Sequence, residues 1–210
     1  IHSRNNLIEG IAWGINGKVT YDLEGSAFNA GSVIKWLRDE LQLIDSPKRC
    51  DELAESVEDA NGCYLVPAFT GLGAPYWDMY ARGAIVGITR GTKREHIIRA
   101  AQESIAYQSL DLVKAMEKDT GIQLSVLNAD GGASRDAFLM QFQADILDKK
   151  VQRPIVKETT ALGAAYLAGL ATGLWNSREE LKTGDWCDTV FTPDMDSDRR
   201  EKLVKGWHKA

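Results

Sequence analysis

The feature that most constrains this chain is a short apolar segment that leads through two glycines into an amphipathic helix. Residues 126–129 are mostly apolar, Asp130 follows them, and Gly131 and Gly132 come next. Large apolar residues then recur at helical spacing, at Phe138, Phe142, Ile146 and Leu147. A strand, a glycine turn and a helix N-terminus in this order leave backbone N–H groups uncovered and favour negative charge. The segment therefore predicts either a plain strand-to-helix turn, the usual role of an isolated glycine pair, or a place where a nucleotide approaches the main chain.

Strand and helix patterns alternate along the rest of the chain. We predict strands at 7–15, 18–23, 64–67, 84–88 (buried), 125–129 and 151–153. We predict helices at 28–41, 48–59, 161–171, between Thr92 and Gly121, after the glycine pair, and twice in the tail, where they flank an extended segment at 189–191. The Asn16-Gly17 pair predicts a hairpin between the first two strands. Thr92 with Glu95 three residues later predicts a capping box for the long helix.

This order of elements predicts the fold class. An opening hairpin, later strand–helix alternation and short connections favour one α/β domain with a mixed sheet and helices on both faces. Ligands of such folds bind beyond the strand ends, which is where Gly131 and Gly132 lie. We expect the small-residue helix at 160–173 to pack tightly on the sheet, with direct contact to a ligand as the alternative. The loop at 67–83 is rich in aromatic residues, and it either packs against this domain or lines a cleft shared with another one.

Composition argues against several classes of function. The chain has 210 residues, of which 44% are hydrophobic and 26% charged, so we expect one large domain with a substantial core. The net charge of -5 and the lack of a basic block disfavour a nucleic-acid partner. Three scattered cysteines and three dispersed histidines predict no metal site and fit a reducing cytoplasm. We expect no membrane span, since no apolar run is long enough. The first residue, Ile1, suggests a chain that begins inside a longer protein.

Five segments together resemble the glycerol kinases, a branch of the FGGY family of sugar and polyol kinases. They are GSAFNAGSVIKWLRDE (25–40), PAFTGLGAPYWD (67–78), ARGAIVGITRG (81–91), DGGASRDAFLMQFQADIL (130–147) and ETTALGAAYLAGLA (158–171). The resemblance runs over nearly the whole chain. The Pro75–Asp78 loop and the FLMQFQ helix are specific to glycerol kinases within this family.

The resemblance implies an actin-like, ribonuclease H-like ATPase fold with the ligands between two domains. Residues 1–210 correspond to the C-terminal, nucleotide-binding domain, and the N-terminal domain with the catalytic base is absent. We therefore assign no catalytic residue and no metal ligand here, and we expect this segment to be inactive alone. The complete enzyme would transfer the γ-phosphoryl group of Mg2+-ATP to glycerol, giving glycerol 3-phosphate. We expect it to be a cytoplasmic homodimer or homotetramer.

The resemblance also implies which residues contact the nucleotide. Gly31 matches a nucleotide-contacting glycine, and Gly131 and Gly132 match the glycine pair of the family's D-G-G turn. Lys35 stands where many members have Gln, and it offers a charged donor to a phosphate or a carboxylate. Asp136 stands where many have Asn near the adenine.

Two consequences follow for the exact contacts. An ionised Asp136 would accept hydrogen bonds but not donate them, unlike Asn. Gln102 replaces a more usual apolar residue in the long helix, and we expect it to affect packing only.

Two alternatives stay open. The protein is another FGGY kinase, acting on a pentulose or gluconate, although the Pro75–Asp78 loop disfavours this. Otherwise it is a non-catalytic actin-like module whose role is assembly, which would form nucleotide-dependent filaments or bind clients.

Overall fold

The computed structural model describes residues 2–156, 158–182 and 186–210. Along the chain the elements are β1 (Ile8–Ile15), β2 (Lys18–Glu24), α1 (Gly31–Asp39), α2 (Pro47–Glu55), β3 (Tyr64–Val66), β4 (Ala84–Val86), α3 (Arg94–Thr120), β5 (Val126–Asn128), the short 3-10 helix η1 (Gly132–Arg135), α4 (Ala137–Leu147), β6 (Lys150–Pro154), α5 (Thr159–Thr172), the 3-10 helix η2 (Arg178–Lys182), β7 (Cys187–Phe191) and α6 (Ser197–Lys209). The strand and helix order matches the sequence prediction closely. No helix in these ranges is long and apolar enough to cross a membrane.

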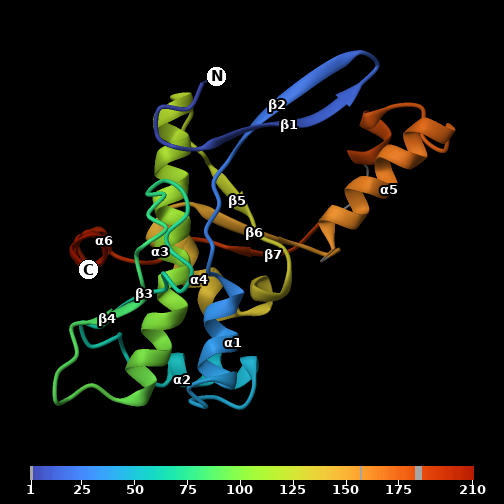
Figure 1. The fold of residues 1–210 in the computed structure, drawn as a ribbon. Helices are drawn as coiled ribbons and strands as arrows, with labels where there is room; N and C mark the ends of the chain where they lie inside the picture. The colour runs from blue at the N-terminus through green and yellow to red at the C-terminus, as the bar shows by residue number, and fades with distance from the viewer. Residues whose placement is uncertain (1, 157, 183–185) are drawn as a thin grey trace.

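The strands form three separate sheets. β1 and β2 make an antiparallel hairpin whose turn, Asn16-Gly17, has positive φ at both residues, as the sequence predicts. β3 pairs antiparallel with β4, and β4 is largely exposed rather than buried as expected. The third sheet, in the order β5-β6-β7, is mixed, because β6 is parallel to β5 and antiparallel to β7. This mixed sheet contains three of the described strands. Figure 1 shows the hairpin standing apart from it.

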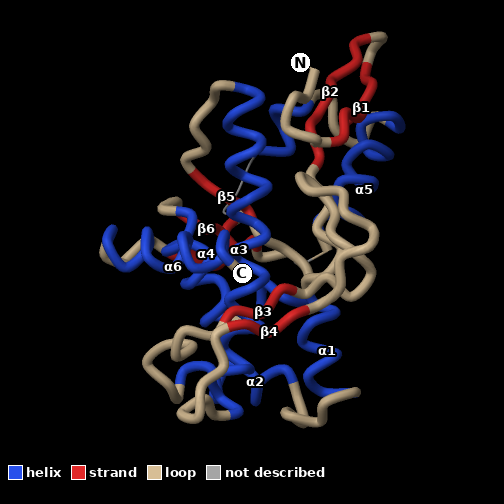
Figure 2. Tube along the Cα trace, turned by 60° about the vertical axis from the view of Figure 1, so that its left-hand side comes forward, coloured by secondary structure: helices blue, strands red, loops and turns tan. Residues whose placement is uncertain are grey.

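The helix α3 runs through the centre of the fold, and α1, α2, α4 and α6 pack along it (Figures 1 and 2). On one side its Tyr107 stacks on Trp207 of α6 at 5.2 Å between ring centroids and meets Phe142 of α4 edge-on at 5.5 Å. On another side, a second buried cluster joins α3 to α1, α2 and β3 through residues such as Leu37 and Ile98. The first cluster includes Leu139 and Met140 near the beginning of α4, which matters for the site below.

The start of α3 differs from the prediction. Lys93 is its N-cap, and the backbone N–H of Lys93 donates to the ring Nδ1 of His96 at 3.0 Å. The hydroxyl of Thr92 accepts a hydrogen bond from the N–H of Thr89 instead. The helix therefore begins one residue later than a Thr92–Glu95 capping box requires, because His96 takes the part expected of Glu95. The other end is as predicted, with Gly121 in the left-handed conformation that glycine adopts without strain.

The helix α5 is the least covered element. Gly169 is its only buried residue, and it lies against the ring of Trp175 from the turn that follows. The expected tight packing of α5 on the sheet is therefore wrong for the described part of the chain. Figure 1 shows α5 projecting from the rest of the fold.

Candidate functional site

The glycine turn after β5 has the open main chain that the sequence suggested. Gly131 has φ +81°, a conformation that residues with a side chain rarely adopt, so the turn itself requires a glycine there. Gly132 has no such constraint, and a Cβ atom at either position would meet no heavy atom within 4 Å. Since neither backbone strain nor crowding within this chain calls for a glycine at 132, the position is free for a close approach from outside. This favours the binding interpretation of the turn over the purely structural one.

The helix that directly follows the glycines is η1, not α4. Both the N–H and the hydroxyl of Ser134 donate to the carbonyl oxygen of Gly131, the hydroxyl at 2.8 Å, and close this short turn. Arg153 of β6 donates to the carbonyl of Ser134 at 3.3 Å. The sequence predicted that an amphipathic helix would begin at the glycines, and this is wrong by four residues, because Ser134 closes a 3-10 turn first. The N-terminus of α4, with its partial positive charge, therefore lies at Asp136.

Asp136 is the N-cap of α4. Its Oδ1 atom accepts a hydrogen bond from the N–H of Leu139 at 2.7 Å, which satisfies one of the free donors at the helix start. Its Oδ2 atom accepts a short hydrogen bond from Nε2 of Gln102, and the same Nε2 donates to Oδ1 of Asp51 at 3.0 Å. Gln102 is fully buried. The expectation that Gln102 affects packing only is therefore wrong, since it bridges the carboxyl groups of α2 and α4.

The protonation of Asp136 also differs from the expectation. Burial, followed by the neighbouring carboxyl group of Asp51, raises the pKa of Asp136 from 3.8 to about 8. At neutral pH Asp136 is then mostly neutral, and a neutral carboxyl group has one O–H donor as well as acceptors. The difference from Asn at this position is smaller than the sequence alone suggested.

Gly31 and Lys35 lie together on α1. Gly31 is the first residue of the helix and is exposed, and a Cβ atom there would meet nothing within 4 Å. Lys35 is exposed one turn later, and it forms no ion pair with the residues that the structure describes. Ala30 and Ile34 pack against the same buried cluster as Ala133 of η1, so α1 begins in the same part of the fold as the glycine turn.

Asn29 was not predicted from the sequence. This side chain is 5% exposed, and its Nδ2 atom has no hydrogen-bond partner, while its Oδ1 accepts from the hydroxyl of Ser32. A buried amide donor without a partner is unusual and costly. It lies two residues before Gly31 and belongs to the candidate site for that reason. Asn has no distinctive spacing in a sequence, so only the burial identifies it.

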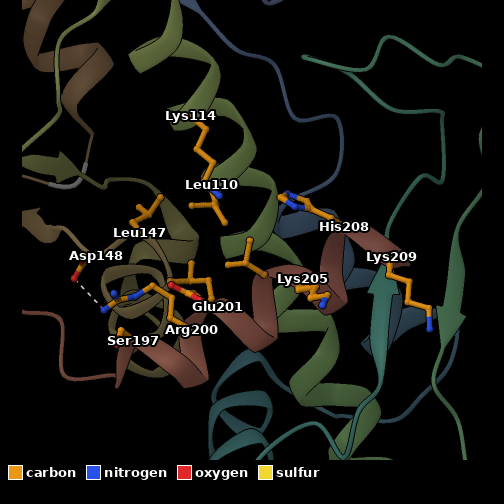
Figure 3. Close-up of a pocket in the computed structure, with 12 residues that line it drawn as sticks. Leu110, Lys114, Leu147, Asp148, Ser197, Arg200, Glu201, Lys205, His208 and Lys209 are labelled. Atoms are coloured by element: carbon orange, nitrogen blue, oxygen red, sulfur yellow. Dashed lines mark ion pairs between the residues drawn. The ribbon is translucent and has the colours of Figure 1, made fainter.

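One cleft on the described part of the chain contains none of the predicted site residues. Figure 3 shows a cleft of about 630 Å³ between α3, α4 and α6, with Lys114, Lys205 and His208 along it. Arg200 in the same cleft is paired with Asp148 at 2.9 Å. In the part of the chain that the structure describes, no group of three His, Cys, Asp or Glu side chains could hold a metal ion.

Comparisons with known proteins show the family to which this chain belongs. Residues 8–172 match the C-terminal domain of the FGGY family of carbohydrate kinases. The chain is 63% identical over 210 residues to the glycerol kinase of Thermoanaerobacter pseudethanolicus and 59% identical over 210 residues to that of Clostridium botulinum. Each alignment includes 100% of this chain and 42% of the relative, so the chain spans less than half of the relatives' length.

Solved structures of carbohydrate kinases are also similar to this chain. The glycerol kinase of Plasmodium falciparum, crystallised with ADP, has a TM-score of 0.90 at 41% identity, over 99% of this chain and 42% of that one. Gluconate kinase from Lactobacillus acidophilus has a TM-score of 0.80 at 27% identity, over 91% of this chain and 39% of that one. Xylulose kinase from the same organism has a TM-score of 0.84 at 25% identity, over 97% of this chain and 41% of that one. These neighbours have the actin-like ATPase fold.

Proposed function

Because the chain belongs to the FGGY family of carbohydrate kinases, as that family's C-terminal domain, we propose that it is the nucleotide-binding half of a glycerol kinase. The complete protein would transfer the γ-phosphoryl group of ATP to a primary hydroxyl of glycerol, giving glycerol 3-phosphate. The observation that carries this proposal is Gly132, an exposed glycine that the fold does not require. A relative of 41% identity with the same fold was crystallised with ADP, which supports a nucleotide as the ligand.

In this proposal the main chain of Gly131 and Gly132 faces the nucleotide, and Gly31 at the start of α1 forms a second open stretch. Lys35 would neutralise a phosphate, since its ammonium group is exposed and forms no ion pair with the described residues. Asp136 would lie near the adenine. Positioning and charge neutralisation supply most of the acceleration in phosphoryl transfer, so a domain that only holds the nucleotide still contributes to the rate.

Mg2+ would bind together with the nucleotide, and the side chains of this half would not hold it. The described residues offer no cluster of three candidate ligands, and Mg2+ in kinases is held by substrate phosphates, waters and one or two carboxylates. When bound, the ion spreads the charge of the phosphate oxygens. The carboxylates that hold it and the catalytic base would come from the other half of the protein.

The other half is the main partner in this proposal. The hairpin exposes Ile11 by 66% and Tyr21 by 73%, and α5 exposes Leu167 by 48%. Exposed apolar side chains gathered on two projecting elements are typical of surfaces that pack against another part of a protein. We expect the N-terminal half to cover them, and we expect the assembled enzyme to be a cytoplasmic homodimer or homotetramer.

The substrate claim has a direct test. The full-length protein and the 210-residue chain are each assayed for ADP production with glycerol, xylulose and gluconate. We expect turnover of glycerol by the full-length protein only. Turnover of xylulose or gluconate without glycerol would overturn the substrate, and filament formation with ATP and no turnover would favour an assembly module.

A further inference from the structure

Three side chains from three different helices meet at the N-terminus of α4. Asp51 comes from α2, Gln102 from α3, and Asp136 caps α4 itself. One amide nitrogen, Nε2 of Gln102, donates to both carboxyl groups, while its Oε1 atom is buried without a partner. The two carboxyl groups are therefore held on one buried amide.

The groups around this cluster leave the second negative charge uncompensated. Arg99, one turn before Gln102 on α3, is committed to Glu103 at 2.8 Å and to the carbonyl oxygens of Ala54 and Val57. On α2 the neighbouring titratable group is the thiol of Cys50, whose pKa is raised to about 12 by burial and by the two carboxyl groups.

Two more charged groups lie on the elements next to the cluster, and both are exposed. Arg135 is the last residue of η1, beside Asp136, and Lys35 lies on α1. Neither guanidinium nor ammonium forms an ion pair with Asp51 or Asp136. The two carboxyl groups are half-buried and lie beside each other without a paired cation, so burial and the neighbouring carboxyl group of Asp51 raise the pKa of Asp136.

We propose that Asp136 keeps its proton at neutral pH because the carboxyl group of Asp51 lies beside it, and that Gln102 is the positioning residue that holds the two together, so that the wall of the nucleotide pocket stays uncharged at Asp136. This inference rests on the proposed nucleotide site and adds a pH dependence to it. When this proton is lost, a negative charge develops at Asp136, the N-cap of α4, which the proposed function places near the adenine of the anionic ligand. Like charge weakens nucleotide binding, so the affinity falls as Asp136 ionises.

The experiment is a calorimetric titration of the full-length kinase with ADP between pH 7.5 and 9.5. A nucleotide phosphate has lost its last proton below this range, since its second pKa is about 6. For the wild type we expect the dissociation constant to rise by roughly fivefold or more across the range, the lower end of ordinary coupling between sites. The rise should be absent in Asp136→Asn, which has no carboxyl group to ionise.

Two further variants separate positioning from simple loss of structure. Asp51→Asn removes the like charge but leaves Asp136 buried, so Asp136 should ionise at lower pH and the weakening should begin at a lower pH than in the wild type. If Gln102 holds the two carboxyl groups together, Gln102→Leu already separates them. Adding Asp51→Asn to Gln102→Leu should then have little effect on how the ADP affinity depends on pH. Glu52→Gln is the matched control, because Glu52 is the exposed neighbour of Asp51 on α2 and pairs with Arg49. It should follow the wild type.

The outcomes distinguish this inference from the proposed function. An ADP affinity that stays constant from pH 7.5 to 9.5 would overturn the protonated Asp136 and leave the nucleotide site intact. The inference would also be overturned if the ADP affinity of Asp136→Asn fell across this pH range as much as that of the wild type. No ADP binding at any pH would overturn the nucleotide site itself. If Asp136→Asn does not fold, the comparison of Asp51→Asn with its control decides between the same outcomes.

Discussion

Replacing Gly132 with valine separates binding from folding in this protein. Gly132 is exposed, its φ is not left-handed, and a Cβ atom there meets nothing within 4 Å. The free energy of unfolding should therefore change by no more than about 0.5 kcal/mol, as for ordinary surface substitutions. If a nucleotide packs against this main chain, the three added carbon atoms occupy its place. We expect the dissociation constant for ADP to rise at least tenfold, which corresponds to about 1.4 kcal/mol.

The assay is isothermal titration of the full-length protein with ADP, with thermal unfolding measured on the same samples. Gly91→Val is the matched control, because Gly91 is also exposed, has no left-handed φ and has only ordinary contacts at 3.7 Å and 3.8 Å from a Cβ atom. Gly131→Ala should behave differently, since φ +81° with ψ -174° costs a residue with a side chain about 1–3 kcal/mol of stability. An unchanged ADP affinity in a folded Gly132→Val protein would refute the reasoning.

Three further changes test the surrounding structure. Because the pKa of Asp136 is raised from 3.8 to about 8, the folded protein holds an extra proton between these pH values. The free energy of unfolding should therefore fall as pH rises, by at most about 1.4 kcal/mol per pH unit. Urea unfolding at pH 5 and pH 8 should show a smaller fall in Asp136→Asn than in the wild type. Asp111→Ala should destabilise the fold by about 2–4 kcal/mol in the same assay, because its buried carboxylate accepts from Trp207 at 2.8 Å and from Tyr76 at 3.0 Å; a loss below about 1 kcal/mol would contradict this. Gly87→Ala should cost about 2–4 kcal/mol, since its Cβ atom would lie 2.0 Å from the carbonyl oxygen of Gly62 at φ +82°, and a thermal midpoint equal to the wild type would exclude that clash.

The elements that depend on local chemistry were predictable from the sequence. The Asn16-Gly17 turn and the Gly121 cap each follow from residues that adopt positive φ readily, and both are present. The glycine turn after β5 was predictable for the same reason. The boundary of α4 was not, because the hydroxyl of Ser134 competes for the carbonyl of Gly131 and delays the helix.

The contacts that depend on packing were not predictable. Gln102 meets Asp51 and Asp136 across 51 and 34 residues of sequence, so nothing local indicates the cluster. The same holds for α5, whose composition suggests tight packing although no large part of the described chain covers it. The resemblance to glycerol kinases named the positions of the site, but only the structure gives the protonation and partners of Asp136.

A crystal structure of the full-length protein with ADP tests the central claim most directly. We predict that the nucleotide lies in van der Waals contact with the main chain of Gly131 and Gly132, with the other half of the protein facing it. Density for ADP elsewhere, with this turn covered by side chains of the protein itself, would contradict the claim.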